Sequence, residues 1–185
     1  MSSKKNRNDI ITLPDERLHQ KSARVGFIDE SIHQLAEDMI AASLDWEASR
    51  DHEACAALAA VQIGILERVV IVRDDMETRG EGKGNSSFSV FINPEIVKLM
   101  GDPEEMWEGC LSVDSVYGHV LRHPKVKIKA LNLDGKEVRL TATGFLSQVF
   151  QHEIDHTNGI VFVDRVKDNT KLRKIGDDGE FTKLP

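Results

Sequence analysis

The segment 151–159, QHEIDHTNG, combines residue types and a spacing that suit metal chemistry. Four residues of helix turn through about 400°, so His152 and His156 would emerge on one face, about one turn apart. Two neutral imidazoles placed in this way can share one metal ion, and Glu153 would lie beside them, within reach of a metal-bound water. The same spacing also arises by chance on exposed helices, where such side chains are merely solvated. The segment alone therefore leaves both interpretations open.

A complete site needs a further ligand, because a catalytic metal ion usually has three protein ligands and one open position for water. The chain has two cysteines, and Cys110 in the segment WEGCLSV follows a glycine just before a β-rich region. We interpret Cys55, by contrast, as a buried small apolar residue. Cys110 is thus the candidate for the third ligand. A thiolate with two imidazoles suits iron, cobalt, nickel and zinc alike, so these residue types do not select the ion.

Two helices are predicted from the spacing of apolar residues. The first follows Asp29, a candidate N-cap, and its apolar positions fall on one face. These positions are Ile32, Leu35, Ala36, Met39 and Trp46. The second helix contains the two histidines. Thr143 is its candidate N-cap, and Asn158 and Gly159 form a natural C-terminal stop.

Strand signals dominate the middle of the chain. Strand character is found in segments 68–73, 89–97, 125–133 and 136–143. Asp134-Gly135 is the turn of a hairpin, and Pro94 is expected to interrupt the strand that contains it. The apolar run 160–163 indicates a further short strand, and 53–65 has helical propensity. The segment 76–89 is rich in glycine, serine and charge, which is typical of a surface loop.

The order of these elements predicts an α+β fold. In this fold, mixed or antiparallel β-sheets pack around a central metal-binding helix, and an amphipathic helix lies near the N-terminus. With 185 residues, the chain is long enough for one sizeable core and short for two. We therefore expect a single domain over 1–185, with about residues 1–10 and 166–185 as flexible tails.

Composition limits the classes of partner. The formal net charge is −7, with 31 acidic against 24 basic residues, which argues against direct DNA binding and against a general membrane-surface binder. No apolar run approaches the roughly 20 residues that a bilayer span needs, and the first residues lack the apolar region of a signal peptide. A secreted disulfide-rich domain would usually have more than two cysteines, so we expect a cytoplasmic protein.

Three segments in order resemble those of the peptide deformylase family: ALAAVQIG at 57–64, EGCLS at 108–112 and QHEIDH at 151–156. The resemblance spans at least residues 14–164. It implies hydrolysis of the N-terminal formyl group of formylmethionyl peptides or nascent chains, at the ribosome, with release of formate. It also implies one divalent metal ion held by Cys110, His152 and His156. The expected ion in the cell is Fe²⁺, with Zn²⁺, Ni²⁺ or Co²⁺ as substitutes.

The resemblance implies further roles for individual residues. Glu153 would be the general base, and the side-chain amide of Gln62 and the backbone N–H of Leu111 would face the developing oxyanion. Outer residues would orient the metal ligands. The candidates for that task are Glu108, Ser112 and Asp155. The candidates for substrate contact are Ala57, Leu58, Tyr117 and Arg122.

The chain departs from the family pattern where peptide should bind. Cys55 and Ala57 stand where the family has glycines, and Val61 stands where it has proline. Tyr117 stands where many relatives have arginine, and the family pattern has proline at the position of Asp114. Every metal and base position matches, so hydrolysis is expected to be intact while substrate preference is open.

Two other functions compete with the deformylase hypothesis. One is a deformylase-like amidase that acts on a different formyl or N-acyl substrate. The other is a non-catalytic binding protein that is stabilised by the metal. Glu153 argues against the second, because a structural site needs no base and closes its fourth coordination position.

Overall fold

The computed structural model describes residues 4–50, 54–74, 87–176 and 180–183. Most of the loop predicted at 76–89 lies outside the described residues. Within the described part of the chain, no helix is long and apolar enough to cross a membrane.

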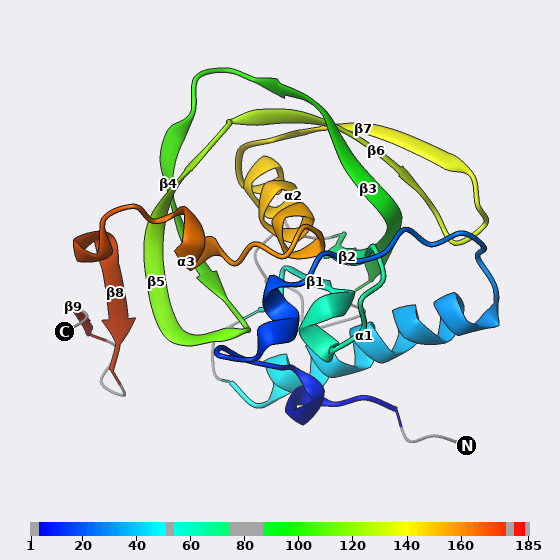
Figure 1. Cartoon of the computed structure of the whole chain (residues 1–185), viewed down its shortest axis with the longest axis horizontal. Coiled ribbons are helices and arrows are strands. Elements are labelled where there is room, and N and C mark those ends of the chain that lie inside the picture. Colours follow the sequence, from blue (N-terminus) through cyan, green and yellow to red (C-terminus); the bar gives the residue numbers. More distant parts are fainter. Residues whose placement is uncertain (1–3, 51–53, 75–86, 177–179, 184–185) are drawn as a thin grey trace.

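The fold is α+β, as predicted, with two antiparallel sheets (Figure 1). The larger sheet has the strand order β1-β2-β3-β6-β7, and the smaller has the order β4-β5-β8-β9. The strands are β1 (Ala57–Ala59), β2 (Val69–Arg73), β3 (Phe88–Met100), β4 (Glu104–Cys110), β5 (Val113–Arg122), β6 (Lys125–Leu131), β7 (Glu137–Thr143), β8 (Leu172–Ile175) and β9 (Phe181–Lys183). The α-helices are α1 (Glu30–Ala48), α2 (Gly144–Thr157) and α3 (Phe162–Arg165). Short 3₁₀ helices are η1 (Arg7–Asp9), η2 (Glu16–His19), η3 (Ala60–Ile63) and η5 (Asn169–Lys171).

Helix α2 is central, which confirms the expected arrangement. It packs against strands of the larger sheet, and Figure 1 shows it enclosed by that sheet with β4 and β5 alongside. Its apolar residues Val149, Phe150 and Ile154 are buried among residues of β1, β2, β3, β6 and β7. Thr143 is its N-cap residue, and Gly159 follows its end with a φ of +74°. A side chain at Gly159 would come within 2.6 Å of the His19 carbonyl oxygen, so glycine is required there.

Helix α1 is also confirmed, with Asp29 as the N-cap that accepts a hydrogen bond from the Ser31 backbone N–H. Its apolar face, which includes Ile32, Leu35 and Met39, packs on the other side of the larger sheet. The two helices therefore sandwich strands β1 and β2. This packing holds the start of the larger sheet rigidly beside α2.

Two predictions of local structure are wrong. Segment 160–163 does not form a strand, because the Val161 backbone N–H bonds to the Asp164 carboxylate and starts the short helix α3. Segment 53–65 contains no α-helix in its described residues. It forms β1, which pairs with β2, and then η3, because pairing with the following strand outweighs the helical propensity of its alanines.

Strand β3 continues past Pro94 instead of stopping there. The register against β6 shifts between Ile92 and Glu95, so the proline lies at a bulge, where its missing N–H costs no ladder bond. Part of the segment expected to be a flexible tail is also regular, because β8 pairs with β5 and β9 pairs with β8. At the other end of the chain, η1 forms within the segment expected to be an N-terminal tail.

Candidate metal centre and active site

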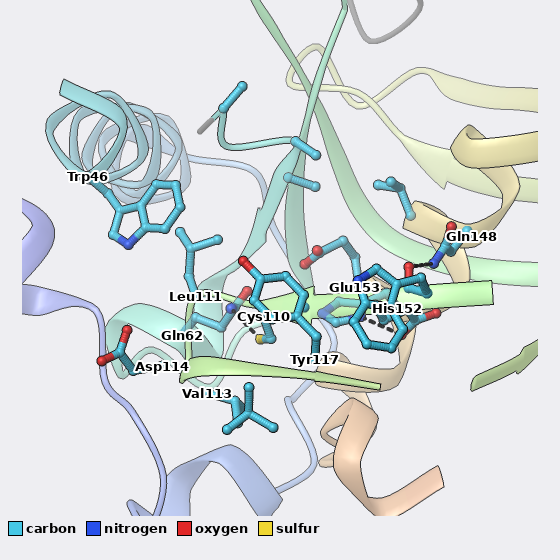
Figure 2. A pocket seen from close by; sticks show the side chains of 18 of the residues that line it. Trp46, Gln62, Cys110, Leu111, Val113, Asp114, Tyr117, Gln148, His152 and Glu153 are labelled. Carbon is cyan, nitrogen blue, oxygen red and sulfur yellow. Dashed lines mark hydrogen bonds and ion pairs between the residues drawn. The ribbon is translucent and has the colours of Figure 1, made fainter. Parts of the chain in front are cut away.

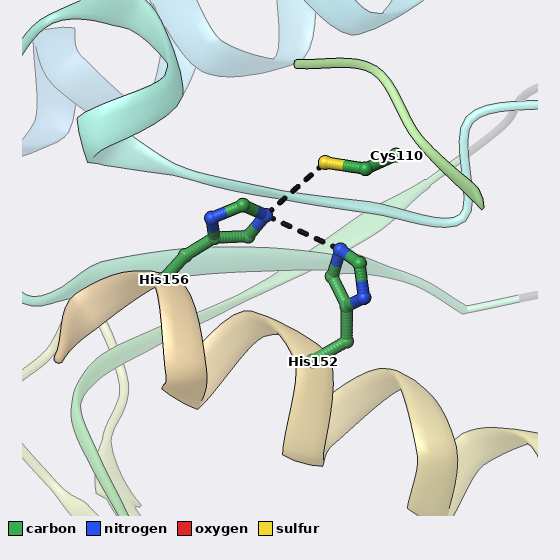
Figure 3. A group of neighbouring side chains, drawn as sticks. All are labelled: Cys110, His152 and His156. Atoms are coloured by element: carbon green, nitrogen blue, oxygen red, sulfur yellow. Dashed lines mark hydrogen bonds between the residues drawn. The ribbon is translucent and has the colours of Figure 1, made fainter. Parts of the chain in front are cut away.

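Three side chains from two parts of the fold converge on one point (Figure 3). Cys110 Sγ lies 3.3 Å from His156 Nε2, which lies 3.2 Å from His152 Nε2. The three candidate ligand atoms all lie within 4.8 Å of one another. Such a cluster of one sulfur and two imidazole nitrogens fits a divalent transition metal ion.

The local structure explains this convergence. His152 and His156 lie one turn apart on α2, as their spacing predicts. Cys110 ends β4, where the register against β5 shifts after Gly109 and turns the chain toward the helix. The thiol also accepts a hydrogen bond from the Ser112 backbone N–H at 3.4 Å, which suits a thiolate.

The two histidines are held differently. The Glu108 carboxylate lies 2.9 Å from His152 Nδ1, which leaves Nε2 directed at the common point. His156 is fully buried, and its Nδ1 has no hydrogen-bond partner among the described residues. Burial lowers the pKa of His156 well below its usual value, so its imidazole is neutral and able to bind a metal.

A buried network of ion pairs fixes the position of Glu108, the partner of His152. Arg122 donates to both oxygens of Glu108, at 2.7 and 3.0 Å, and to Asp155 at 2.6 Å. Arg165 also pairs with Asp155. Burial alone would raise the pKa of Glu108, but hydrogen bonds from Arg122 and His152 lower it to about 2. Since this lies below the usual value of 4.5, the network stabilises the fold above that pH, and the stabilisation is lost as the pH falls toward 2.

Replacing Arg122 by methionine is expected to destabilise the fold by about 3–5 kcal/mol, because Glu108 and Asp155 would stay buried without their shared counter-charge. Urea denaturation at pH 7 with equal metal content measures the effect. Arg139 provides the matched control, since it is exposed and pairs with Glu137 on the surface. Arg139→Met should change the free energy of unfolding by no more than about 0.5 kcal/mol. Equal changes in the free energy of unfolding for the two substitutions would show that the buried network contributes no more to stability than a surface ion pair.

Gln62 is oriented by contacts on both of its amide atoms. Its Oε1 accepts from the Ala59 backbone N–H at 2.9 Å, so Nε2 is directed at Cys110 and at the hydroxyl of Ser112, at 3.6 and 3.2 Å. Gln62 and Ser112 are both buried. The amide is therefore a fixed donor at the edge of the candidate metal site.

Glu153 is a buried carboxylate beside the ligands. Its Oε2 has no hydrogen-bond partner among the described residues, although it is shielded from bulk solvent. Burial raises the pKa of this group to about 7. An unpaired buried acceptor is costly, so this oxygen is suited to a donor that arrives with water or substrate.

These groups border one pocket of about 280 Å³ (Figure 2). Cys110, His152, Glu153, Gln62 and Leu111 all line it. Further lining residues come from α1 and the residues just after it, from the smaller sheet and from α2. They include Trp46, Arg50, Trp107, Tyr117, Phe145, Gln148, Val149 and Ile175. The site is thus open to a molecule larger than water on one side of the ligand cluster.

Two of the predicted substrate contacts are in this pocket and two are not. Ala57 and Tyr117 line it. The Leu58 side chain is fully buried in the core under α1, because successive residues of β1 point to opposite faces. Arg122 is buried in the ion-pair network and does not border the pocket. Neither of these two side chains therefore borders the pocket.

Several lining residues were missed by the sequence analysis. Phe145, Gln148 and Val149 precede His152 by seven, four and three positions, a helical spacing that could have placed them on the same face. Trp46 and Ile175 have no comparable signal, because they reach the pocket through tertiary packing from distant segments.

The fold and site together fit a metal-dependent hydrolase, with three converging candidate ligands and a buried carboxylate at an open pocket. The family model for polypeptide deformylase matches residues 7–172. The chain belongs to the peptide deformylase family, whose members are metal-dependent hydrolases.

Relatives with known sequences or structures support this assignment. The peptide deformylase of Thermomicrobium roseum is 44% identical over 173 residues, which cover 94% of this chain and 93% of that protein. The crystal structure of a peptide deformylase from Legionella pneumophila superposes with a TM-score of 0.75 at 38% identity, covering 89% of this chain and 87% of that one. The Met-Ala-Ser bound crystal structure of a class I type b peptide deformylase from Acinetobacter baumannii gives a TM-score of 0.74 at 31% identity. The match covers 90% of this chain and 100% of that one.

Proposed function

We propose that this protein removes the formyl group from the N-terminal formylmethionine of peptides or nascent chains, releasing formate. The observation that supports this most directly is the buried Glu153 carboxylate, which lines one pocket with Cys110 and His152 and whose Oε2 has no hydrogen-bond partner among the described residues. A non-catalytic metal site would not need such a carboxylate. The relatives described above are all named for deformylase activity, which favours this substrate over another N-acyl group.

Cys110, His152 and His156 would hold the metal ion, which when bound supplies Lewis-acid polarisation and lowers the pKa of a water toward neutrality. Glu153 would accept a proton from the attacking water and transfer it to the leaving amine. The Gln62 side-chain amide and the Leu111 backbone N–H would donate to the oxygen that becomes negative in the transition state. Glu108 would keep His152 in its ligating orientation.

We further propose Fe²⁺ as the ion in the cell, with Zn²⁺, Ni²⁺ or Co²⁺ as functional substitutes. The one-sulfur, two-nitrogen donor set fits all four ions. The proposal extends to nascent chains at the ribosome as substrates and to the cytoplasm as the compartment. A chain with only two cysteines, neither in a disulfide, agrees with a reducing compartment.

Formate release from formyl-Met-Ala-Ser, compared with acetate release from acetyl-Met-Ala-Ser, tests the proposed function. The enzyme should be prepared anaerobically and loaded with iron. We expect hydrolysis of the formyl peptide and little or none of the acetyl analogue. Comparable rates for both would favour the broader amidase, and no hydrolysis of either by metal-loaded protein would favour the binding protein.

A further inference from the structure

The start of the larger sheet forms one side of the active-site pocket. Strand β1 lies at the edge of that sheet and pairs only with β2 among the described residues. Its first residue, Ala57, and the preceding Ala56 line the pocket together with Glu153. Residues 55 and 57 are also the two positions at which this chain lacks the glycines of the family pattern. A displacement of this backbone would change the shape of the pocket beside the carboxylate.

Two charged residues from other elements hold this backbone. Arg73, the last residue of β2, donates from Nε to the Cys55 carbonyl oxygen at 2.9 Å and from Nη2 to the Glu47 carboxylate. Glu47, in the last turn of α1, also accepts from the Cys55 backbone N–H at 3.2 Å. The Arg73 backbone N–H donates to the Ala56 carbonyl oxygen at 2.9 Å. The two residues thus bind both backbone polar groups of Cys55 and the carbonyl of Ala56.

The Glu47–Arg73 pair is itself well fixed. The exposed fractions of the two side chains are 27% for Glu47 and 7% for Arg73, so solvent competes little for their contacts. The Arg73 guanidinium also lies over the Phe88 ring, 5.0 Å from its centroid, which limits the positions it can adopt. Hydrogen bonds that involve a charged partner are the stronger kind. The pair therefore provides a firm support for residues 55 and 56.

Glu47 is unfavourable for the helix to which it belongs. A carboxylate in the last turn of a helix lies at the negative end of the helix dipole, and α1 has no basic residue in that turn. The contacts that compensate Glu47 lie outside the helix, at Arg73 and Cys55. The chain thus places a charge pair at the point where the family glycines are absent.

We propose that Glu47 and Arg73 are positioning residues for the reaction, which hold residues 55–57 in the place that the formyl peptide requires beside Glu153. The inference rests on the proposed function. Neither charged side chain lines the pocket, so both act on the substrate only through the backbone that they bind. The pair therefore contributes to substrate binding without touching the substrate.

The reacting groups are held independently of this pair. Leu58 and Ala59 pair with Ile71 and Val70 of β2, and the Ala59 backbone N–H orients the Gln62 amide. The candidate metal ligands lie on β4 and α2, and neither Glu47 nor Arg73 contacts those elements through a hydrogen bond or ion pair that the described residues form. Loosening the pair should therefore weaken substrate binding and leave the chemical step in place.

Steady-state kinetics of Arg73→Met with formyl-Met-Ala-Ser test the positioning role. Methionine retains a long side chain but donates to neither the Cys55 carbonyl nor Glu47. We expect KM to rise about 3–10-fold and kcat to change by less than about twofold, well short of the roughly 10²-fold that a 1 Å misplacement of reacting groups can cost. Metal content should equal that of the parent. A purely structural contribution would lower the melting temperature and leave the KM of the folded protein unchanged.

Arg73→Lys is the conservative comparison and covers the case in which Arg73→Met folds poorly. Lysine keeps the charge opposite Glu47 but lacks the forked donors that reach Glu47 and the Cys55 carbonyl together. It should return the melting temperature toward the parental value and give a KM between those of the parent and Arg73→Met. Arg24→Met is the matched control, because Arg24 pairs with Glu95 at the surface and neither residue lines the pocket.

Three kinetic results would overturn the proposal. The first is a parental KM in either folded Arg73 variant. The second is a fall in kcat at least as large as the rise in KM, since the pair would then act on the reacting groups. The third is an equal rise in KM for Arg24→Met, which would show that loss of any surface arginine has the same effect.

Product binding separates this proposal from the proposed function. The chain has two tryptophans, Trp46 and Trp107, and both line the pocket, so their emission reports its occupancy. Met-Ala-Ser should bind Arg73→Met with a Kd about 3–10-fold above that of the parent. This result in metal-loaded protein that hydrolyses no formyl peptide would refute the activity and keep the role of the pair in peptide binding. Hydrolysis by the parent with equal Kd values for the two proteins would keep the activity and overturn the positioning role. Neither hydrolysis nor binding by the parent would overturn both.

Discussion

Replacing Glu153 by glutamine is expected to reduce kcat/KM at least about 10²–10⁴-fold, the contribution usual for a positioned general base. Glutamine preserves the shape of the side chain but cannot accept a proton from the attacking water. Since Glu153 is not among the three converging candidate ligands, the metal content should stay at the parental level. Formate release and elemental analysis on the same preparation measure both effects.

The control is Glu104→Gln, a change of the same chemistry at an exposed position on β4. It should leave kcat/KM and metal content at the parental values. If Glu153→Gln retained activity within about threefold of the parent, well short of the effect of a general base, another group would have to move the proton.

The second large effect is expected from Cys110→Ala, which reduces the ligand set from three side chains to two. Substitutions that only disorient a ligand typically cost about 10–100-fold in metal affinity, and loss of the ligand itself should cost at least as much. Most of the bound metal should therefore be lost during desalting. Elemental analysis of the purified protein, expressed as ions per chain, measures this directly.

Cys55→Ala is the matched control for the cysteine substitution. The Cys55 thiol is fully buried, donates to the Ala57 carbonyl oxygen and has a pKa that burial raises to about 12, so it stays protonated. Its replacement should leave the metal content unchanged and cost only the stability associated with a small cavity. Equal metal content in the two variants would refute the assignment of Cys110 as a ligand.

Helix α2, which contains both histidines, could be predicted because its sequence signals are local. The spacing of His152 and His156, the cap at Thr143 and the stop at Gly159 all act within one helix, and the structure confirms its position. The hairpin at Asp134-Gly135 was predictable for the same reason, since turn geometry depends on the turn residues themselves.

Other features depend on contacts that no local pattern contains. The apolar run 160–163 fits a strand or a helix equally well, and the cap from Asp164 decides between them. Leu58 and Arg122 lie next to functional residues in sequence but are turned into the core or into ion pairs. Ile175 could not be placed beside Cys110 in advance, because only the pairing of β8 with β5 brings the C-terminal segment to the pocket.

The origin of the three ligands has a mechanical consequence. Cys110 belongs to the smaller sheet, whereas both histidines belong to the helix that packs on the larger sheet. A bound ion would therefore link the smaller sheet to helix α2 and close the loop of chain between Cys110 and His152. It would then stabilise the packing of the two sheets in addition to its chemical role. In its absence, the first opening of the molecule should occur along the seam between the two sheets, with the interiors of both left intact.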